Sequence, residues 1–359
     1  LWLNYLMFMF VELLPILIAI VTTFIAITLL RPIAVSINLT DVPGTRKLHT
    51  GSIPLIGGLS MFLGVIVSSF FITYDLEEFN YFLLASLLLV CIGVLDDIFD
   101  ISILLRLFFQ TLVAIIIVSG ADMIIFSAGD LFGHGEIMLN GWAYFFSVIV
   151  IIASINAVNM ADGIHGLAGG NSIITFVAIS FLLIGNMHHP ELAISLIFCS
   201  VLMVFLVHNL CLGMPKSKRI FMGDAGSMFI GAGLVWMLIG LSQGQFKVFN
   251  PVIALWIFAA PIIDMTFVIF RRLAANKSPF KPDLFHTHHL LLHLGIKQNN
   301  VLLIVLLFSL IMAVLGVLGE LNKVAEWIMF YGFLTVFVIY VILCNAAIKK
   351  IKNKTKLSS

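Results

Sequence analysis

Long apolar runs separated by short polar segments extend over almost the whole chain. A helix that crosses a bilayer needs about 20 mostly apolar residues, and eleven stretches approach this length. They cover approximately residues 8–30, 55–73, 80–95, 103–119, 142–158, 171–187, 190–210, 227–243, 250–270, 300–318 and 325–347. The pattern predicts an all-α polytopic membrane protein with about 11 transmembrane helices.

The polar segments between these stretches are too short to hold a separate soluble domain. On one side the longest are 31–54, 211–226 and 271–299. On the other side the longest is 120–141, where three acids and a histidine among Gly and Ser predict an exposed hairpin or a short helix. We expect residues 1–348 to form a single integral-membrane domain, followed by a basic tail at 349–359.

Basic residues indicate the orientation, because Lys and Arg collect in loops on the inner side of a membrane. With the N-terminus outside, seventeen of the nineteen Lys and Arg residues fall in inside loops or the tail, and only Lys247 and Lys323 fall outside. The sequence therefore predicts an N-terminus outside and a C-terminus in the cytoplasm. The first apolar stretch is followed, not preceded, by a basic residue, Arg31, so we interpret it as a retained helix rather than a signal peptide.

Composition narrows the class of protein further. Of 359 residues, 61% are hydrophobic and 10% are charged, with a mean hydropathy of +1.16, which excludes an ordinary soluble globule and a disordered chain. The four cysteines show no paired spacing, so we expect small apolar residues rather than a disulfide framework or a zinc site. No nucleic-acid partner is expected.

Acidic residues gather at the inner ends of apolar runs, where charge beside hydrocarbon is costly and usually functional. Asp96, Asp97 and Asp100 end the third stretch. On a helix, residues three or four apart share a face, so the three carboxylates lie close together. Such groups repel unless a cation, a proton or a base function is involved. This favours a functional site over a solvated helix end.

A second cluster combines amides, an acid and glycines. Asn156, Asn159 and Asp162 follow one another at three-residue intervals, and Gly163, Gly166, Gly169 and Gly170 come next. Amide side chains donate and accept hydrogen bonds to a base, a sugar or a metal shell. The glycines allow the backbone to approach a phosphate closely. The alternative is a helix end with Asn caps and Gly breakers.

A third cluster stands at the start of an apolar helix. Lys216, Lys218 and Arg219 precede a Gly-Asp-x-Gly-Ser sequence that contains Asp224. A helix N-terminus favours phosphate, and Asp224 could hold a divalent cation that bridges phosphates. Phe221 could stack on a flat base.

A fourth cluster is histidine-rich. His286, His288 and His289 follow several Lys and Arg residues, and without thiolates they suit a pyrophosphate or a sugar better than zinc. The first inside loop adds Arg46 and Lys47. Asp264 lies one or two turns before Arg271 and Arg272, and we expect it to pair with one of them.

Together these clusters supply carboxylates for a metal, cations for phosphate and glycines for close approach, all at the cytoplasmic lipid boundary. Phosphoryl transfer depends mainly on positioning and charge neutralisation. A site at the bilayer surface can present a water-soluble phosphate donor to a lipid acceptor.

The motifs resemble those of one family, the polyprenyl-phosphate N-acetylhexosamine-1-phosphate transferases. The family patterns are Asp-Asp-x-x-Asp, Asn-x-x-Asn-x-x-Asp-Gly, Gly-Asp-x-Gly-Ser and His-x-His-His, and all four occur here in that order. The chain departs from the family at two positions. His165 stands where relatives often have a second Asp, and Leu284 stands where they carry Arg before the histidine motif.

The resemblance implies transfer of N-acetylglucosamine 1-phosphate from UDP-N-acetylglucosamine to undecaprenyl phosphate, with UMP as the second product. It also implies Mg²⁺ or Mn²⁺ as cofactor and the bacterial inner membrane as location, with the N-terminus periplasmic and the active face cytoplasmic. The pathway implied is O-antigen, enterobacterial common antigen or a related surface polysaccharide. The oligomeric state stays open, a homodimer included.

By the same resemblance, Asp96 and Asp97 are the catalytic residues at the lipid phosphate, and Asp224, Asn159 and Asp162 belong to the metal. The remaining candidates are substrate-binding residues: Arg46, Lys47, Asp100, Asn156, Phe221, His286, His288 and His289.

Two other interpretations remain open on the residues alone. An intramembrane prenyltransferase also uses Asp-rich motifs and Mg²⁺ at helix ends, but it needs neither the Gly-Asp-x-Gly-Ser sequence nor the histidine cluster. A secondary transporter predicts charged residues near helix midpoints instead of at one end.

Overall fold

The computed structural model describes residues 2–41, 51–73, 77–184, 190–244, 247–279 and 285–357. This part of the chain is almost entirely helical. The helices are α1 (Trp2–Ser36), α2 (Gly57–Ser69), α3 (Glu77–Phe99), α4 (Ile103–Gly120), α5 (Ala143–Ala161), α6 (Leu167–Leu183), α7 (Pro190–Asn209), α8 (Gly223–Ser242), α9 (Pro251–Ile257), α10 (Ala259–Ala274), α11 (Thr287–His293), α12 (Gln298–Leu321) and α13 (Glu326–Leu357). Two short strands, β1 (Thr40–Asp41) and β2 (Ile53–Pro54), pair antiparallel.

Every predicted apolar stretch coincides with a helix or with the pair α9 and α10. Within the described ranges, eight helices are long and apolar enough to cross a membrane, and α9 with α10 makes up to nine. The two remaining apolar helices, α2 and α6, are shorter, at 13 and 17 residues. The chain is therefore a multi-pass helical membrane protein.

The stretch predicted over 250–270 is broken, with α9 and α10 bent by 86°. Pro261 has no N–H, so the Ile257 carbonyl loses its donor four residues along the helix. Thr175 on α6 donates its hydroxyl to that carbonyl at 2.8 Å instead. A neighbouring helix thus satisfies the carbonyl that the break exposes, as a backbone group in hydrocarbon requires.

Helix α8 forms the centre of the bundle, and 94% of the residues in its apolar stretch are buried. Small residues let its neighbours approach. A Cβ on Gly58 of α2 would lie 2.1 Å from the Gly226 nitrogen, and one on Gly93 of α3 would lie 2.3 Å from the Ala225 Cα. Glycine at these positions brings α2 and α3 directly against the first turn of α8, as small residues do between membrane helices.

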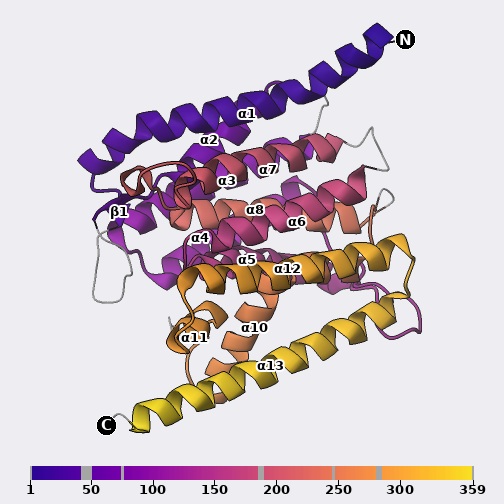
Figure 1. Cartoon of the computed structure of the whole chain (residues 1–359). Helices are drawn as coiled ribbons and strands as arrows, with labels where there is room; N and C mark the ends of the chain where they lie inside the picture. Colours follow the sequence, from indigo (N-terminus) through magenta and orange to yellow (C-terminus); the bar gives the residue numbers. More distant parts are fainter. Residues whose placement is uncertain are drawn as a thin grey trace.

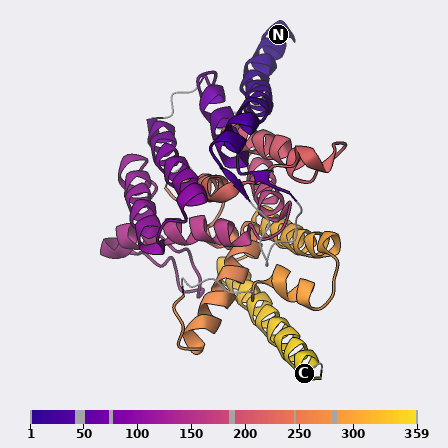
Figure 2. The same cartoon turned by 90° about the vertical axis from the view of Figure 1, so that its left-hand side faces the viewer.

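The two ends of the bundle carry different features (Figure 1). Strand β1, helix α11 and the C-terminus lie at one end, and the N-terminus lies at the other. In both views α1 and α13 occupy opposite margins of the bundle (Figures 1 and 2). The polar segment after α4 forms a bridge between Ser127 and Met138 and a short 3₁₀ helix at Asn140–Trp142, which confirms the predicted hairpin.

Candidate active site

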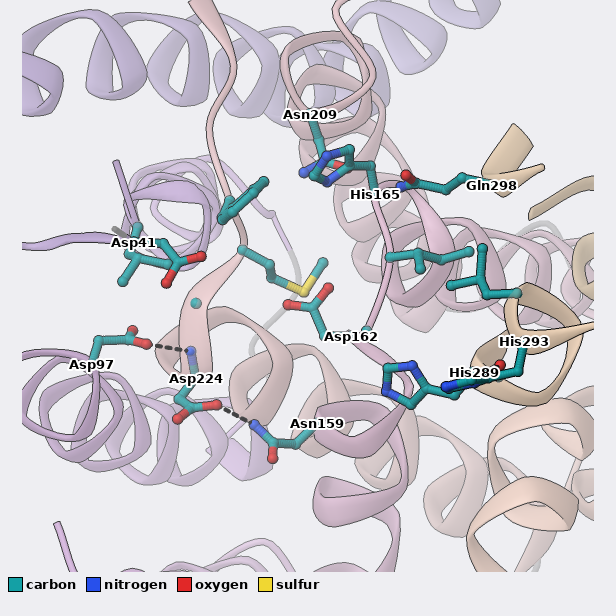
Figure 3. A pocket seen from close by; sticks show the side chains of 17 residues that line it. Asp41, Asp97, Asn159, Asp162, His165, Asn209, Asp224, His289, His293 and Gln298 are labelled. Atoms are coloured by element: carbon teal, nitrogen blue, oxygen red, sulfur yellow. Dashed lines mark hydrogen bonds between the residues drawn. The ribbon is translucent and has the colours of Figure 1, made fainter. Parts of the chain in front are cut away.

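A cavity of about 630 Å³ opens at the end of the bundle that holds β1 and α11. Seven helices or their flanking turns contribute polar side chains to it (Figure 3). The polar residues are Asp97, Asn159, Asp162, His165, Asn209, Asp224, His289, His293 and Gln298, and the lining also includes Asp41 of β1 and the ring of Phe221. Residues from the four sequence clusters, separated by nearly 200 positions, therefore meet in one cavity.

Asp97 of α3 lies against the N-terminus of α8. Its Oδ1 accepts a hydrogen bond of 3.0 Å from the backbone N–H of Asp224. The partial positive charge of a helix N-terminus favours a carboxylate there. The second oxygen, Oδ2, is buried and accepts no hydrogen bond. It lies 2.5 Å from where a Cβ of Gly223 would be, and Gly223 has φ +71°. Glycine at 223 is therefore required both by its backbone conformation and by the carboxylate beside it.

Asp224 is held by an amide from α5. Asn159 donates its side-chain N–H to Asp224 Oδ1 at 2.6 Å and to Ser227 Oγ at 2.9 Å. Figure 3 shows both the Asp97 and the Asn159 contacts on the same residue. Asp162 follows the end of α5, and its side chain points into the cavity near Asp224. Asp97 thus holds the backbone of Asp224 at the α8 N-terminus, and Asn159 holds its carboxylate.

Burial among protein atoms, and then the charge of Asp224, raise the pKa of Asp162 to about 7. The Asp162 side chain is nevertheless exposed to the cavity, so water weakens both effects. A cation between Asp162 and Asp224 would reverse them.

These oxygens suit a hard divalent cation. Mg²⁺ usually takes one or two carboxylates and completes its shell with substrate phosphates and water. Asp224 and Asp162 provide the carboxylates, and Asn159 orients one of them. Among the described residues, no group of three or more His, Cys, Asp and Glu side chains could hold a metal by itself. The donor set therefore fits an ion that arrives with a phosphate ligand.

Asp96 has a different environment from Asp97. It is buried, and its Oδ2 pairs with Arg106 Nη1 at 3.0 Å, while its Oδ1 accepts the Ile101 N–H at 3.0 Å. Arg106 also reaches Asp224 Oδ2 at 3.8 Å. Sequence reasoning counted Arg106 only as a topological charge. One sequence feature could have indicated its role. Ser102 caps the start of α4, so Arg106 lies in the first turn of the helix that follows Asp96.

Five of the predicted site residues that the structure describes do not line the cavity: Asp96, Asp100, Asn156, His286 and His288. Asp100 ends α3 with φ +49° and is exposed. Asn156 donates its amide to Gln110 Oε1 on α4 at 2.7 Å, one helical turn from Asn159. The structure brings Asn159 and Asp162 to the cavity but gives Asn156 a helix-to-helix contact.

Phe221 lines the cavity beside His165, with ring centroids 5.0 Å apart. The backbone around Phe221 is anchored, because its N–H donates to the Pro54 carbonyl and its carbonyl accepts from Gly57. Asn209, which sequence reasoning missed, ties this wall together. It accepts the Gly166 N–H at 2.6 Å and donates to the Ile220 carbonyl at 2.9 Å. Asp41 of β1 also lines the cavity and had drawn no specific prediction.

Only part of the histidine-rich segment reaches the cavity. His289 and His293 of α11 line the cavity, whereas His286 and His288 are buried behind it. His288 packs its Nε2 against Gly163, where a Cβ would lie 2.0 Å away. Burial, followed by the neighbouring His289, lowers the pKa of His288 to about 3, so this imidazole is neutral near pH 7.

The prediction for Asp264 needs correction. Its carboxylate accepts hydrogen bonds from His286 Nδ1, the Thr287 N–H and hydroxyl, and the Tyr340 hydroxyl. These four donors occupy the acceptor sites that a pairing with Arg271 or Arg272 would need. Arg46, Lys47 and Leu284 lie outside the described residues.

Comparison with known proteins agrees with this geometry. Residues 79–242 match the model of glycosyl transferase family 4. An undecaprenyl-phosphate alpha-N-acetylglucosaminyl 1-phosphate transferase of Yersinia pestis is 37% identical over 86% of this chain and 85% of its own length. Transferases of the same name from Escherichia coli and Haemophilus influenzae are 36% and 37% identical, over 86% and 89% of this chain and 84% and 90% of their own.

A membrane enzyme that transfers a sugar phosphate is the class that fold and site define. The chain belongs to glycosyl transferase family 4, among the polyprenyl-phosphate N-acetylhexosamine-1-phosphate transferases. This assignment replaces the prenyltransferase and transporter interpretations.

Proposed function

We propose that this enzyme transfers N-acetylglucosamine 1-phosphate from UDP-N-acetylglucosamine to undecaprenyl phosphate. The products are undecaprenyl-diphospho-N-acetylglucosamine and UMP. The observation that carries the proposal is the convergence of Asp97, Asp162 and Asp224 at the N-terminus of α8. The names of relatives that align over most of the chain supply the two substrates.

The carboxylates of the site serve different substrates: two act on the donor diphosphate and one on the acceptor phosphate. Asp224 and Asp162, with Asn159 as orienting amide, would hold Mg²⁺ or Mn²⁺ beside the donor diphosphate. The cation supplies charge neutralisation for the diphosphate. Asp97, which lines the cavity beside the α8 N-terminus, acts at the acceptor phosphate. Arg106 lies between Asp96 and Asp224 and offsets part of their negative charge.

The remaining cavity walls would contact the nucleoside and the sugar of UDP-N-acetylglucosamine. The rings of Phe221 and His165 lie together on one wall, and His289 and His293 line the wall across from Asp97 (Figure 3). The reaction follows as attack of the lipid phosphate oxygen on the β-phosphorus. The bond from that phosphorus to the bridging oxygen breaks, and UMP leaves. A covalent aspartyl intermediate is the rival course. Inversion at a chiral β-phosphorus supports direct attack, and retention would exclude it.

The cavity opens to the cytoplasm, where the donor is made, and the N-terminus lies on the periplasmic side of the inner membrane. Support comes from the inside excess of basic residues and from the termini at opposite ends of the bundle (Figure 1). The product begins O-antigen, enterobacterial common antigen or a related polysaccharide.

Label transfer from radioactive UDP-N-acetylglucosamine to undecaprenyl phosphate tests the function. We expect lipid-linked label with the purified protein and Mg²⁺, and at least a 100-fold loss with Asp224→Asn. Asp122→Asn is the matched control, because Asp122 is an acid in the hairpin segment at the other end and the change preserves its φ of +51°. Equal activity of the two variants would contradict the site assignment, and absence of label with the wild type would contradict the function.

A further inference from the structure

A largely enclosed carboxylate on α10, that of Asp264, contacts the first two residues of the histidine motif. Asp264 lies behind the cavity, and its side chain is 15% exposed. Its Oδ2 meets His286 Nδ1 at 2.6 Å. Its Oδ1 accepts from the Thr287 N–H at 2.8 Å, the Thr287 hydroxyl at 2.7 Å and the Tyr340 hydroxyl at 2.8 Å. One carboxylate thus joins α10, α11 and α13.

The contact with His286 sets the tautomer of that residue. A carboxylate with four donors around it acts only as an acceptor, so the shared proton is on His286 Nδ1. The His286 side chain is 8% exposed. Its orientation is therefore fixed by burial and by a short, charge-assisted hydrogen bond.

The contact with Thr287 fixes the start of α11. Thr287 is the first residue of this helix, and His286 precedes it with extended φ and ψ. The helix has no side-chain cap from its own N-cap residue, so Asp264 satisfies one N–H that would otherwise be unpaired. Asp264 thereby contacts the start of α11, the helix that carries His289 and His293.

Contacts between histidine rings connect His286 to the cavity. The His286 and His288 rings are stacked, with centroids 5.7 Å apart at 14°, and His288 and His289 are 4.2 Å apart. His288 in turn packs against Gly163, the neighbour of Asp162. A shift of His286 would therefore be felt at His289 and at the turn that carries Asp162.

We propose that Asp264 is a positioning residue for the transfer reaction: through His286 it sets the orientation of the histidine motif that lines the donor side of the cavity. The proposal rests on the proposed function, and it concerns a residue that touches neither substrate. Because α11 faces the donor side, loss of the contact affects the donor kinetics and leaves the lipid acceptor kinetics unchanged.

A double-mutant cycle on the full-length protein tests the coupling. Asp264→Asn keeps the shape but presents an amide N–H or a neutral oxygen to His286. Loss of a charge-assisted hydrogen bond lowers kcat/KM for UDP-N-acetylglucosamine by about 10- to 100-fold. We expect a similar loss for His286→Ala and no further loss when both changes are combined. The KM for undecaprenyl phosphate stays within about twofold of the wild type.

Tyr340→Phe is the matched control, because it removes the tyrosine hydroxyl from Asp264 Oδ1 and from the Thr287 hydroxyl but leaves the His286 contact intact. We expect it to reduce kcat/KM by less than about fivefold. If Asp264→Asn is not recovered as a folded protein, Asp264→Glu replaces it in the same cycle, with a milder loss that again disappears beside His286→Ala.

The outcomes separate the two hypotheses. Losses that multiply in the double variant, or an equal rise in KM for both substrates, would overturn the positioning role. Wild-type kinetics in Asp264→Asn would do the same. A wild-type protein that makes no lipid-linked product would instead overturn the proposed function.

Discussion

The contact between Gly223 and Asp97 allows a sharp test of the site geometry. An alanine Cβ at 223 would lie 2.5 Å from Asp97 Oδ2, about 1 Å short of ordinary contact. The substitution also carries a left-handed backbone cost of about 1–2 kcal/mol. The carboxylate must therefore move away from the α8 N-terminus. A misplacement of this size lowers kcat by a factor on the order of 10².

Gly213 provides a matched control for the backbone cost. It has φ +68°, close to the +71° of Gly223, but nothing lies within 4 Å of its Cβ position. Gly213→Ala should therefore lower the melting temperature through the backbone cost alone, and Gly223→Ala should lower it at least as much, because it adds the contact with Asp97. Only Gly223→Ala should lose activity in the label-transfer assay. A Gly223→Ala protein with wild-type kcat, or a Gly213→Ala protein that is equally inactive, would refute the role given to Asp97.

Three further predictions follow from the same contacts. Arg106→Gln leaves the buried Asp96 carboxylate without its ion-pair partner, so thermal unfolding should show a loss of about 3 kcal/mol, and Asp96→Asn in the same background should recover part of it. His288 binds a proton more readily when unfolded, at its ordinary pKa of about 6.5, than when folded, at about 3. The contribution of neutral His288 to stability is complete above pH 6.5 and declines toward pH 3. His288→Gln should therefore reduce the dependence of the melting temperature on pH between pH 4.5 and 7. A dependence as steep as that of the wild type would contradict the burial argument. EDTA should abolish transfer and Mg²⁺ should restore it, with Asp224→Asn needing far more Mg²⁺ for half-maximal rate; equal Mg²⁺ requirements would remove Asp224 from the metal.

Hydrophobic pattern predicted the helices well, because each must bury apolar surface in lipid and satisfy its own backbone. The break after Ile257 escaped this reasoning. Apolar length does not reveal that Pro261 removes a donor and that Thr175, more than 80 positions earlier, replaces it. The break is tolerated because α6 packs against α9 and supplies a hydrogen-bond donor for the Ile257 carbonyl.

The candidate site was predicted in part for a similar reason. Carboxylates beside hydrocarbon indicated Asp97, Asp162 and Asp224 from the sequence, and these residues line one cavity. Sequence could not assign separate roles to Asp96 and Asp97, because their side chains leave the helix in different directions and the sequence does not reveal what packs on each side. Asp96 turns toward Arg106 and Asp97 toward the α8 N-terminus. Asp264 was assigned to nearby arginines, whereas the folded chain brings it to His286, 22 positions away.

The central claim is that an intact sugar phosphate moves from donor to lipid. The most direct measurement uses UDP-N-acetylglucosamine labelled with ³²P at the β-phosphorus and ¹⁴C in the sugar, with undecaprenyl phosphate, Mg²⁺ and the purified protein. We predict that both labels enter the lipid product in the ratio of the donor and that UMP forms in equal amount. Transfer of the ¹⁴C sugar alone, with UDP released and the ³²P left on the nucleotide, would contradict the account.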